Sequence, residues 1–148
     1  RTTTTEAYSM KFPESLPVFG DQNFRGECPL EEAEQATFFS QLRKLHPETY
    51  GRIALHPKNE GKRRCAQFAQ LARDKALGMA KSAPDVVLPG APTLLIEIKR
   101  RDHTQSKWQD GQVEYLETAQ SLGCFVAVAL GWQGAIAAFE AWLSASNQ

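Results

Sequence analysis

Apolar residues recur at helical spacing in the first half of the chain. Phe38, Leu42 and Leu45 follow one another at intervals of four and three, so they share one face of a helix. A proline and the acidic run EEAE precede them, as is typical of a helix start, and Pro47 ends the pattern. The sequence therefore predicts a helix over residues 29–46.

The rest of the chain alternates between short apolar runs, which predict strands, and longer amphipathic stretches, which predict helices. After the first helix we expect, in chain order, a strand at 51–56, a helix at 64–77, a hairpin of strands at 85–89 and 93–100, a helix at 106–122, a strand at 124–130 and a helix at 133–145. This order predicts the α/β class, with a mixed central sheet of about four strands flanked by helices.

The N-terminal part has no such pattern. Residues 6–28 are rich in turn-forming proline and glycine and are interpreted as an extended arm, and residues 1–5 as a disordered leader or an artificial extension. A chain of 148 residues is near the commonest size for one domain. We therefore expect an arm over residues 1–28 and a single domain over residues 29–148.

Charge is distributed unevenly although 17 Lys and Arg balance 17 Asp and Glu. Residues 52–107 carry 12 basic and 5 acidic side chains, a net of +7, whereas residues 1–51 carry 5 against 8 and residues 108–148 carry 0 against 4. The zero net charge therefore conceals a basic central region, which is the kind of surface that nucleic acids bind.

Several classes of protein are excluded by what the sequence lacks. The longest apolar run, CFVAVAL, is far shorter than the roughly 18 residues of a membrane span. Three widely spaced cysteines support neither a disulfide framework nor a zinc site, His46, His56 and His103 lack the spacing of metal ligands, and no glycine-rich loop indicates a nucleotide cofactor. We expect a soluble, cytoplasmic protein that binds neither membrane nor ATP.

Two charged residues interrupt the predicted strand 93–100. Because side chains alternate between the two faces of a strand, Glu97 and Lys99 point to the same face, and burying them is costly without partners. A divalent cation and an anionic substrate would compensate both, and Asp85 on the partner strand would add a second carboxylate. The alternative is an exposed edge strand in which Glu97 and Lys99 form an ordinary salt bridge.

Polar residues on two predicted helices are candidates for the same site. One stripe of the predicted helix 106–122 consists of Trp108, Gln112, Tyr115, Ala119 and Leu122. Gln112 is the polar residue within this packing stripe, and a buried amide needs hydrogen-bond partners. These are either the groups of the site or backbone groups of the core. Glu31 and Glu34 share the packing face of the first helix, where they either face the site or are solvated acids favoured by the helix dipole.

Together, the segments APDVVLP and LIEIKR resemble the P-D…E-x-K signature of the PD-(D/E)XK nuclease superfamily. The E-x-x-x-Q start of the first helix (Glu31–Gln35), an H-P-x-N loop (His56–Asn59) and the helix QVEYLETAQSLG are similar to the VRR-NUC branch, particularly to its small stand-alone phage and bacterial members. The resemblance covers roughly residues 29–139 and implies a restriction-endonuclease-like core.

Carried over position by position, the resemblance implies a centre for Mg²⁺ or Mn²⁺. Asp85, Glu97 and the main-chain carbonyl of Ile98 would bind the metal, while Lys99 would orient or activate the attacking water and contact the scissile phosphate.

The resemblance also assigns residues outside the hairpin and includes one departure. Gln112 would be the motif residue on the helix and Glu31 the N-terminal acid, with Glu34 competing for that role as a metal ligand. Ser82 stands where the family usually has glycine, which leaves the geometry of the turn before Asp85 open.

These parts would hydrolyse a phosphodiester bond of DNA. The resemblance implies branched substrates, including four-way (Holliday) junctions, and a homodimer, for which Trp132, Phe139 and Trp142 are candidate contacts if they are not core. The alternatives are a nuclease for flap, single-stranded or linear duplex DNA, and a non-catalytic DNA-binding module. The residues expected to bind DNA are Lys58, Lys62, Arg63, Arg64, Arg100, Arg101 and Lys107.

Overall fold

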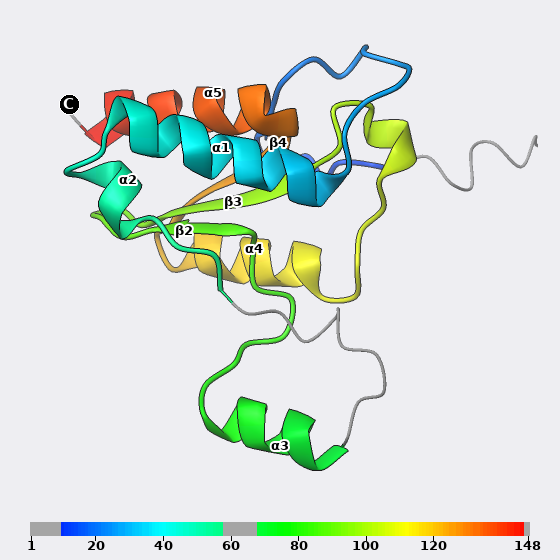
Figure 1. Ribbon diagram of the computed structural model, residues 1–148. Coiled ribbons are helices and arrows are strands. Elements are labelled where there is room, and N and C mark those ends of the chain that lie inside the picture. The colour runs from blue at the N-terminus through cyan, green and yellow to red at the C-terminus, as the bar shows by residue number, and fades with distance from the viewer. Residues whose placement is uncertain (1–9, 58–67, 147–148) are drawn as a thin grey trace, which may run out of the picture.

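The computed structural model describes residues 10–57 and 68–146 as a sheet between two helical layers (Figure 1). The sheet has four strands in the order β1, β4, β3, β2. β3 (Leu94–Lys99) pairs in parallel with β4 (Phe125–Leu130) and antiparallel with β2 (Val86–Leu88), and β1 (Val18–Phe19) pairs in parallel with β4 at the other edge. The predicted α/β class with a mixed sheet of four strands is confirmed.

Helices cover both faces of the sheet. α1 (Glu31–Leu45) and α5 (Gly131–Ser146) lie side by side on one face, and α4 (Gln112–Ser121) lies on the other (Figure 1). Alternation along β3 assigns its side chains to these layers, because Ile96 and Ile98 belong to the core under α1 and α5 while Leu95 packs in the core under α4. Glu97 and Lys99 have the same parity as Leu95, so they point to the α4 side.

The strand expected at 51–56 is wrong. Residues Tyr50–Ile53 form the short helix α2, and only Leu55 pairs with a strand, through a bridge to Val87. The N–H of Gly51 bonds to the carbonyl of His46, and a Cβ on Gly51 would come within 2.7 Å of the α1 backbone. The segment therefore folds against the end of α1, and apolar composition alone does not reveal this close approach.

The helix expected at 106–122 begins later, at Gln112. A 3-10 turn, η3 (His103–Gln105), and an irregular stretch precede it, and Gly111 has a positive φ of 85° at its start. Leu122 lies beyond the helix and is 81% exposed, so its place on the packing stripe is also wrong. Residues before Gly111 are not helical because their groups contact β3, as described below.

The helix expected at 64–77 is observed as α3 (Phe68–Ala76), and residues 64–67 lie outside the described part of the chain. α3 projects from the sheet and its helices (Figure 1). Phe139 and Trp142 are 2% and 4% exposed and fill the core beneath α5, so neither is free for a contact between subunits. No described helix is long and apolar enough to cross a membrane.

The N-terminal segment contributes to the sheet although its sequence showed no strand period. Met10 and Leu16 are buried against Leu95 and Val128 in the α4-side core, and Val18–Phe19 extends the sheet as β1. Residues 10–28 therefore lie on the domain along their length rather than apart from it.

Candidate active site

The charged residues of β3 are buried in the interior of the sheet. Glu97 is 2% exposed and Lys99 is 1% exposed, and β3 has a neighbouring strand on each side. The alternative of an exposed edge strand with a surface salt bridge is therefore wrong. Burying an acid and a lysine this completely requires compensating partners, which the surrounding loops and α4 supply.

Gln112, the first residue of α4, lies between these two charges. Its side-chain nitrogen donates to Glu97 Oε1 at 3.0 Å, and its oxygen accepts from Lys99 Nζ at 2.9 Å. The oxygen also accepts from the main-chain N–H of Gln109, so the orientation of the amide follows from its partners. Lys99 Nζ itself lies 3.7 Å from Glu97 Oε1. The amide thus holds both charged groups of β3.

Lys99 has two further neighbours in the loop before α4. Its ammonium donates to the main-chain carbonyl of Lys107 at 2.9 Å and lies 4.8 Å from the ring centroid of Trp108. The sequence predicted a helix here and placed Trp108 on its stripe. The structure instead uses this loop to surround the ammonium, and nothing in the periodicity of the sequence could have indicated it.

Asp85 directly precedes β2 and lies beside the second half of β3. Its carboxylate accepts the main-chain N–H of Ile98 at 2.7 Å. Because the N–H and C=O of one strand residue point to the same side, the carbonyl of Ile98 also points toward Asp85. Asp85, Glu97 and Ile98 therefore bring carboxylate and main-chain oxygens to one region.

The electrostatics of Glu97 reflect this convergence. Burial raises the pKa of the Glu97 carboxyl well above its usual value, and Asp85 and Glu31 raise it further, whereas Lys99 acts in the opposite direction. A raised carboxyl pKa between like charges is the situation that a divalent cation relieves. The donor set fits a metal on this ground.

The number of ligands sets a limit on that metal site. No group of three or more His, Cys, Asp or Glu side chains within residues 10–57 and 68–146 is arranged to hold an ion. The candidate set is two carboxylates and one main-chain oxygen. Mg²⁺ commonly binds in this way, through one or two carboxylates, with water and substrate phosphate completing its coordination.

Glu31 and Glu34 have different surroundings. Glu34 is 3% exposed and accepts the main-chain N–H of Trp132, at the first turn of α5. Glu31 is half-buried, accepts from the hydroxyl of Ser106 at 2.9 Å and contributes to the rise in the Glu97 pKa. Glu34 is thus occupied as a helix cap between α1 and α5, whereas Glu31 faces the candidate site.

Ser82 adopts the conformation that a glycine would favour. Its φ is 65°, in the left-handed region, and its hydroxyl donates to the carbonyl of Asp110. Gly111 faces it, and a Cβ on Gly111 would lie 2.8 Å from the Ser82 hydroxyl oxygen. The hydrogen bond offsets the cost of the left-handed backbone and joins the turn before Asp85 to the start of α4.

The N-terminal segment contacts the loop that follows β3. The guanidinium of Arg100 donates to the carbonyls of Cys28 and Pro29, and that of Arg101 lies 4.1 Å from the ring centroid of Phe24. Asp102 is 3% exposed and accepts from the N–H of Gly26. This segment therefore orders the loop between β3 and α4.

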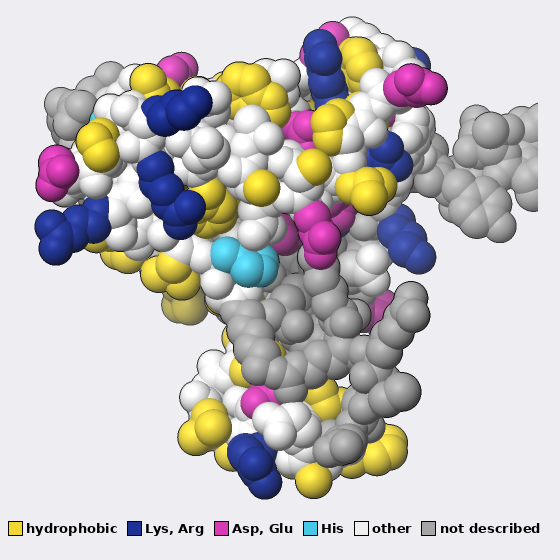
Figure 2. Space-filling view, viewed as in Figure 1, with side chains coloured by type: hydrophobic (Ala, Val, Ile, Leu, Met, Phe, Trp, Pro, Cys, Tyr) yellow, Lys and Arg dark blue, Asp and Glu magenta, His cyan; other side chains and the backbone are white. Residues whose placement is uncertain are grey.

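The residues expected to bind DNA fall into three groups. Lys58, Lys62, Arg63 and Arg64 lie outside the described residues. Arg101 and Lys107 are exposed, whereas Arg100 is half-buried by its bonds to the N-terminal segment. Arg100 and Lys107 line a cleft of about 350 Å³ together with Glu31. In Figure 2, acidic side chains lie near the middle of the visible face, with Lys and Arg side chains on either side of them.

The structure places beside the site a histidine for which the sequence indicated no role there. His56 Nδ1 lies 2.7 Å from the main-chain carbonyl of Asp85, so this nitrogen donates its hydrogen and leaves Nε2 without one in the neutral ring. The sequence indicated no role for His56 as a ligand, because it, His46 and His103 lack the mutual spacing of metal ligands. The H-P-x-N loop was the available signal.

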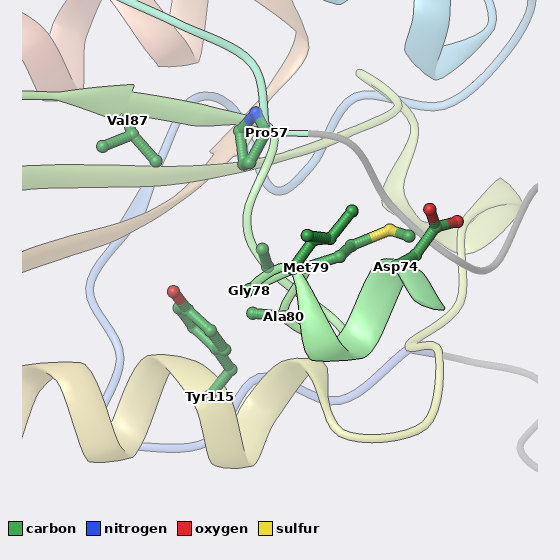
Figure 3. A pocket seen from close by; sticks show the side chains of 9 residues that line it. Pro57, Asp74, Gly78, Met79, Ala80, Val87 and Tyr115 are labelled. Carbon is green, nitrogen blue, oxygen red and sulfur yellow. The ribbon is translucent and has the colours of Figure 1, made fainter. Parts of the chain in front are cut away.

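A separate cavity of about 450 Å³ lies between the end of α3 and the sheet (Figure 3). Tyr115 extends from α4 toward Val87 on one side of it, and Gly78, Met79 and Ala80 lie on the other. None of the residues predicted for catalysis or metal binding lines this cavity, so the candidate active site remains the convergence around Glu97.

The fold is similar to that of a solved structure. That structure is described as a "VRR_NUC domain protein" and superposes with a TM-score of 0.63, covering 82% of this chain and 92% of that chain at 20% sequence identity. No protein-family model and no curated protein sequence matches this chain. The chain has the fold of a VRR-NUC domain, which confirms the expected restriction-endonuclease-like core.

Proposed function

We propose that this protein is a divalent-metal-dependent DNA endonuclease of the VRR-NUC family. The observation that carries the proposal is the buried set of Glu97, Lys99 and Gln112, with Asp85 beside it, on the fold of a VRR-NUC domain. A non-catalytic DNA-binding module does not require a buried acid such as Glu97, whose ionised form is disfavoured by burial and by the nearby carboxylates of Asp85 and Glu31. The cost of such an arrangement is typical of a catalytic site.

Each residue has a definite task in phosphodiester hydrolysis. Mg²⁺ or Mn²⁺, when bound by Asp85, Glu97 and the Ile98 carbonyl, supplies positive charge at the phosphate and lowers the pKa of a coordinated water. Lys99 places a second positive charge where negative charge develops at the phosphate. Gln112 holds Glu97 and Lys99 at their mutual distance, and Glu31 adds a carboxylate at the edge of the site.

We propose branched DNA, including four-way junctions, as the preferred substrate. Arg101 and Lys107 are exposed close to the site, and phosphate contacts of this kind recognise shape rather than base sequence. A homodimer would present two such sites to two strands. Since Phe139 and Trp142 are core residues, the exposed apolar side chains of Phe68 and Leu77 at α3 are the better candidates for its contact.

The test is a panel of labelled DNA substrates with Mg²⁺ or Mn²⁺: a four-way junction, a flap, a linear duplex and a single strand. We expect the junction to be cut fastest, and Lys99→Met, which keeps the length of the side chain without its charge, to bind the junction but not cut it. If the flap, the single strand or the linear duplex is cut faster than the junction, the proposal of a junction nuclease is wrong and the protein is a nuclease for that substrate. Binding without cutting of any substrate would favour the non-catalytic module.

The dimer has its own measurement. Light scattering after size-exclusion chromatography should give twice the chain mass for the wild type and the monomer mass for Phe68→Ser with Leu77→Ser. A monomeric wild type at the concentrations that cut DNA would end this part of the proposal.

A further inference from the structure

We infer that Trp108 is a positioning residue for the catalytic lysine, with its aromatic face held against the ammonium by packing on the N-terminal segment. The inference rests on the proposed function for its catalytic meaning, whereas the contact between Trp108 and Lys99 is independent of that function. Trp108 acts through Lys99, whose ammonium lies 4.8 Å from the centroid of its ring.

Lys99 has an unusual set of neighbours for a buried cation. Its two close acceptors are neutral oxygens, on Gln112 and on the main chain of Lys107, each at 2.9 Å, and the carboxylate of Glu97 is more distant at 3.7 Å. Two neutral hydrogen bonds do not replace the hydration of an ammonium that is 1% exposed. The aromatic face of Trp108, 4.8 Å away, supplies further negative potential.

The ring also affects which hydrogen-bond donors of Lys99 are used. An ammonium has three N–H donors, and two of them are used on Gln112 and Lys107. The face of the Trp108 ring attracts the ammonium as a whole, so no N–H donor of Lys99 has to be used on an oxygen acceptor on the side of the ring. This leaves the third donor for Glu97 or for a phosphate oxygen of the substrate.

Trp108 is held from its far side by the N-terminal segment. Its indole N–H donates to the main-chain carbonyl of Lys11 at 2.8 Å, and the ring lies in the same apolar cluster as Met10 and Phe12. Lys107 and Trp108 are adjacent in the chain, so one dipeptide supplies both the carbonyl and the ring that contact Lys99. A displacement of residues 10–12 would therefore reach the ammonium through a single side chain.

The first experiment measures the contact without reference to activity. Trp108→Leu is made in the wild type and in Lys99→Met, and all four proteins are unfolded with urea. We expect Trp108→Leu to lower the folding equilibrium constant about tenfold more in the wild type than in Lys99→Met, because only the wild type has a cation for the ring. Equal losses in both backgrounds would overturn the inference.

A conservative variant keeps this test decisive if Trp108→Leu does not fold. Trp108→Phe retains an aromatic face but loses the indole N–H. Its matched control is Trp142→Phe, which loses an equivalent bond from an indole to the main-chain carbonyl of Pro92 in the core on the other side of the sheet. Lys99→Met should lower the free energy of unfolding of the Trp108→Phe protein about as much as it lowers that of the wild type, because the Phe ring still presents an aromatic face to the cation. A clearly smaller loss in the Trp108→Phe protein would contradict the inference.

The second experiment uses junction cleavage. Trp108→Leu should lower kcat about tenfold with little change in KM, since it alters the position of Lys99 and leaves the exposed basic residues in place. Trp108→Phe should recover most of the rate, and Trp142→Phe should cut like the wild type. A rise in KM with unchanged kcat, or a Phe variant as slow as the Leu variant, would refute positioning by the ring. If the wild type cuts nothing, the proposed function fails while the urea experiment still decides the contact.

Discussion

The side-chain oxygen of Gln112 accepts a hydrogen bond from the Lys99 ammonium at 2.9 Å, although the two residues belong to a helix and a strand. The other end of the same amide donates to Glu97. An amide is well suited to this place because it combines a donor for the acid with an acceptor for the lysine. Neither a carboxylate nor an alcohol of similar length offers both in fixed positions.

Gln112→Ala should therefore lower the rate of junction cleavage about 10- to 100-fold, the range typical of residues that orient a metal ligand. Gln112→Glu should be slower still, because a carboxylate in this position would repel Glu97. Cleavage rates under single-turnover conditions report both effects. Thr118→Ala, on the exposed side of the same helix, is the control. A Gln112→Glu protein that cuts faster than Gln112→Ala would show that donation to Glu97 has no role.

Glu97→Gln should stabilise the metal-free protein and abolish cutting. Burial and the charges of Asp85 and Glu31 oppose the ionised form of Glu97, and an amide removes that opposition at nearly constant volume. A gain of about 1 kcal/mol would raise the thermal midpoint by about 2–4 °C in a domain of this size. Calorimetry with and without Mg²⁺ is the measurement, and added Mg²⁺ should stabilise the wild type more than the variant. A lower midpoint for Glu97→Gln would mean that its attraction to Lys99 outweighs the repulsion.

Substitutions of Glu31 and Glu34, both on α1, should affect different properties of the protein: Glu34 its stability and Glu31 its activity. Glu34→Ala removes a buried acceptor from the first turn of α5 and should cost about 1–3 kcal/mol in the free energy of unfolding. Glu31→Ala should change stability little and slow cutting, because Glu31 faces the site. Urea unfolding and cleavage assays on both variants are sufficient. Loss of cutting by a stably folded Glu34→Ala, with normal cutting by Glu31→Ala, would reverse the assignment.

Asp102 should make stability depend on pH. Hydrogen bonds from Thr104, and further ones from Gly26 and Gln105, hold the pKa of Asp102 well below its ordinary value of 3.8. A lowered pKa means that the ionised form stabilises the fold, and that this stabilisation is complete above the ordinary value and is lost as the pH falls below it. Asp102→Asn should thus cost about 1–3 kcal/mol at pH 7. The difference from the wild type in urea unfolding should shrink at acid pH. A difference that stays constant from neutral to acid pH would show that charge is not involved.

Much of the fold could be predicted from local pattern. The hairpin β2–β3, the strand β4 and the helices α1 and α5 were visible because each has a period of its own and ends at a glycine, a proline or a change of polarity. The prediction of Asp85, Glu97 and Lys99 as neighbours likewise needed only a hairpin and strand parity. Residues 51–56 and 106–111 were assigned wrongly, because the contacts of Gly51 with α1 and of Lys107 with Lys99 override local preference.

Ser82, Glu34 and Trp108 show where the sequence by itself was insufficient. Strand alternation and helical period are properties of neighbouring residues. They determined the class of the fold, the order of its main strands and helices from residue 85 onward, and the shared face of Glu97 and Lys99. Three features depended instead on partners far away in the chain. Ser82 could replace a glycine because it bonds to Asp110, and Glu34 turned away from the site because it bonds to Trp132. Trp108 lies against the lysine with its indole bonded to Lys11. Only the tertiary structure decided these, because a buried polar group is stabilised by whatever partner the packed chain brings to it, at any distance in sequence.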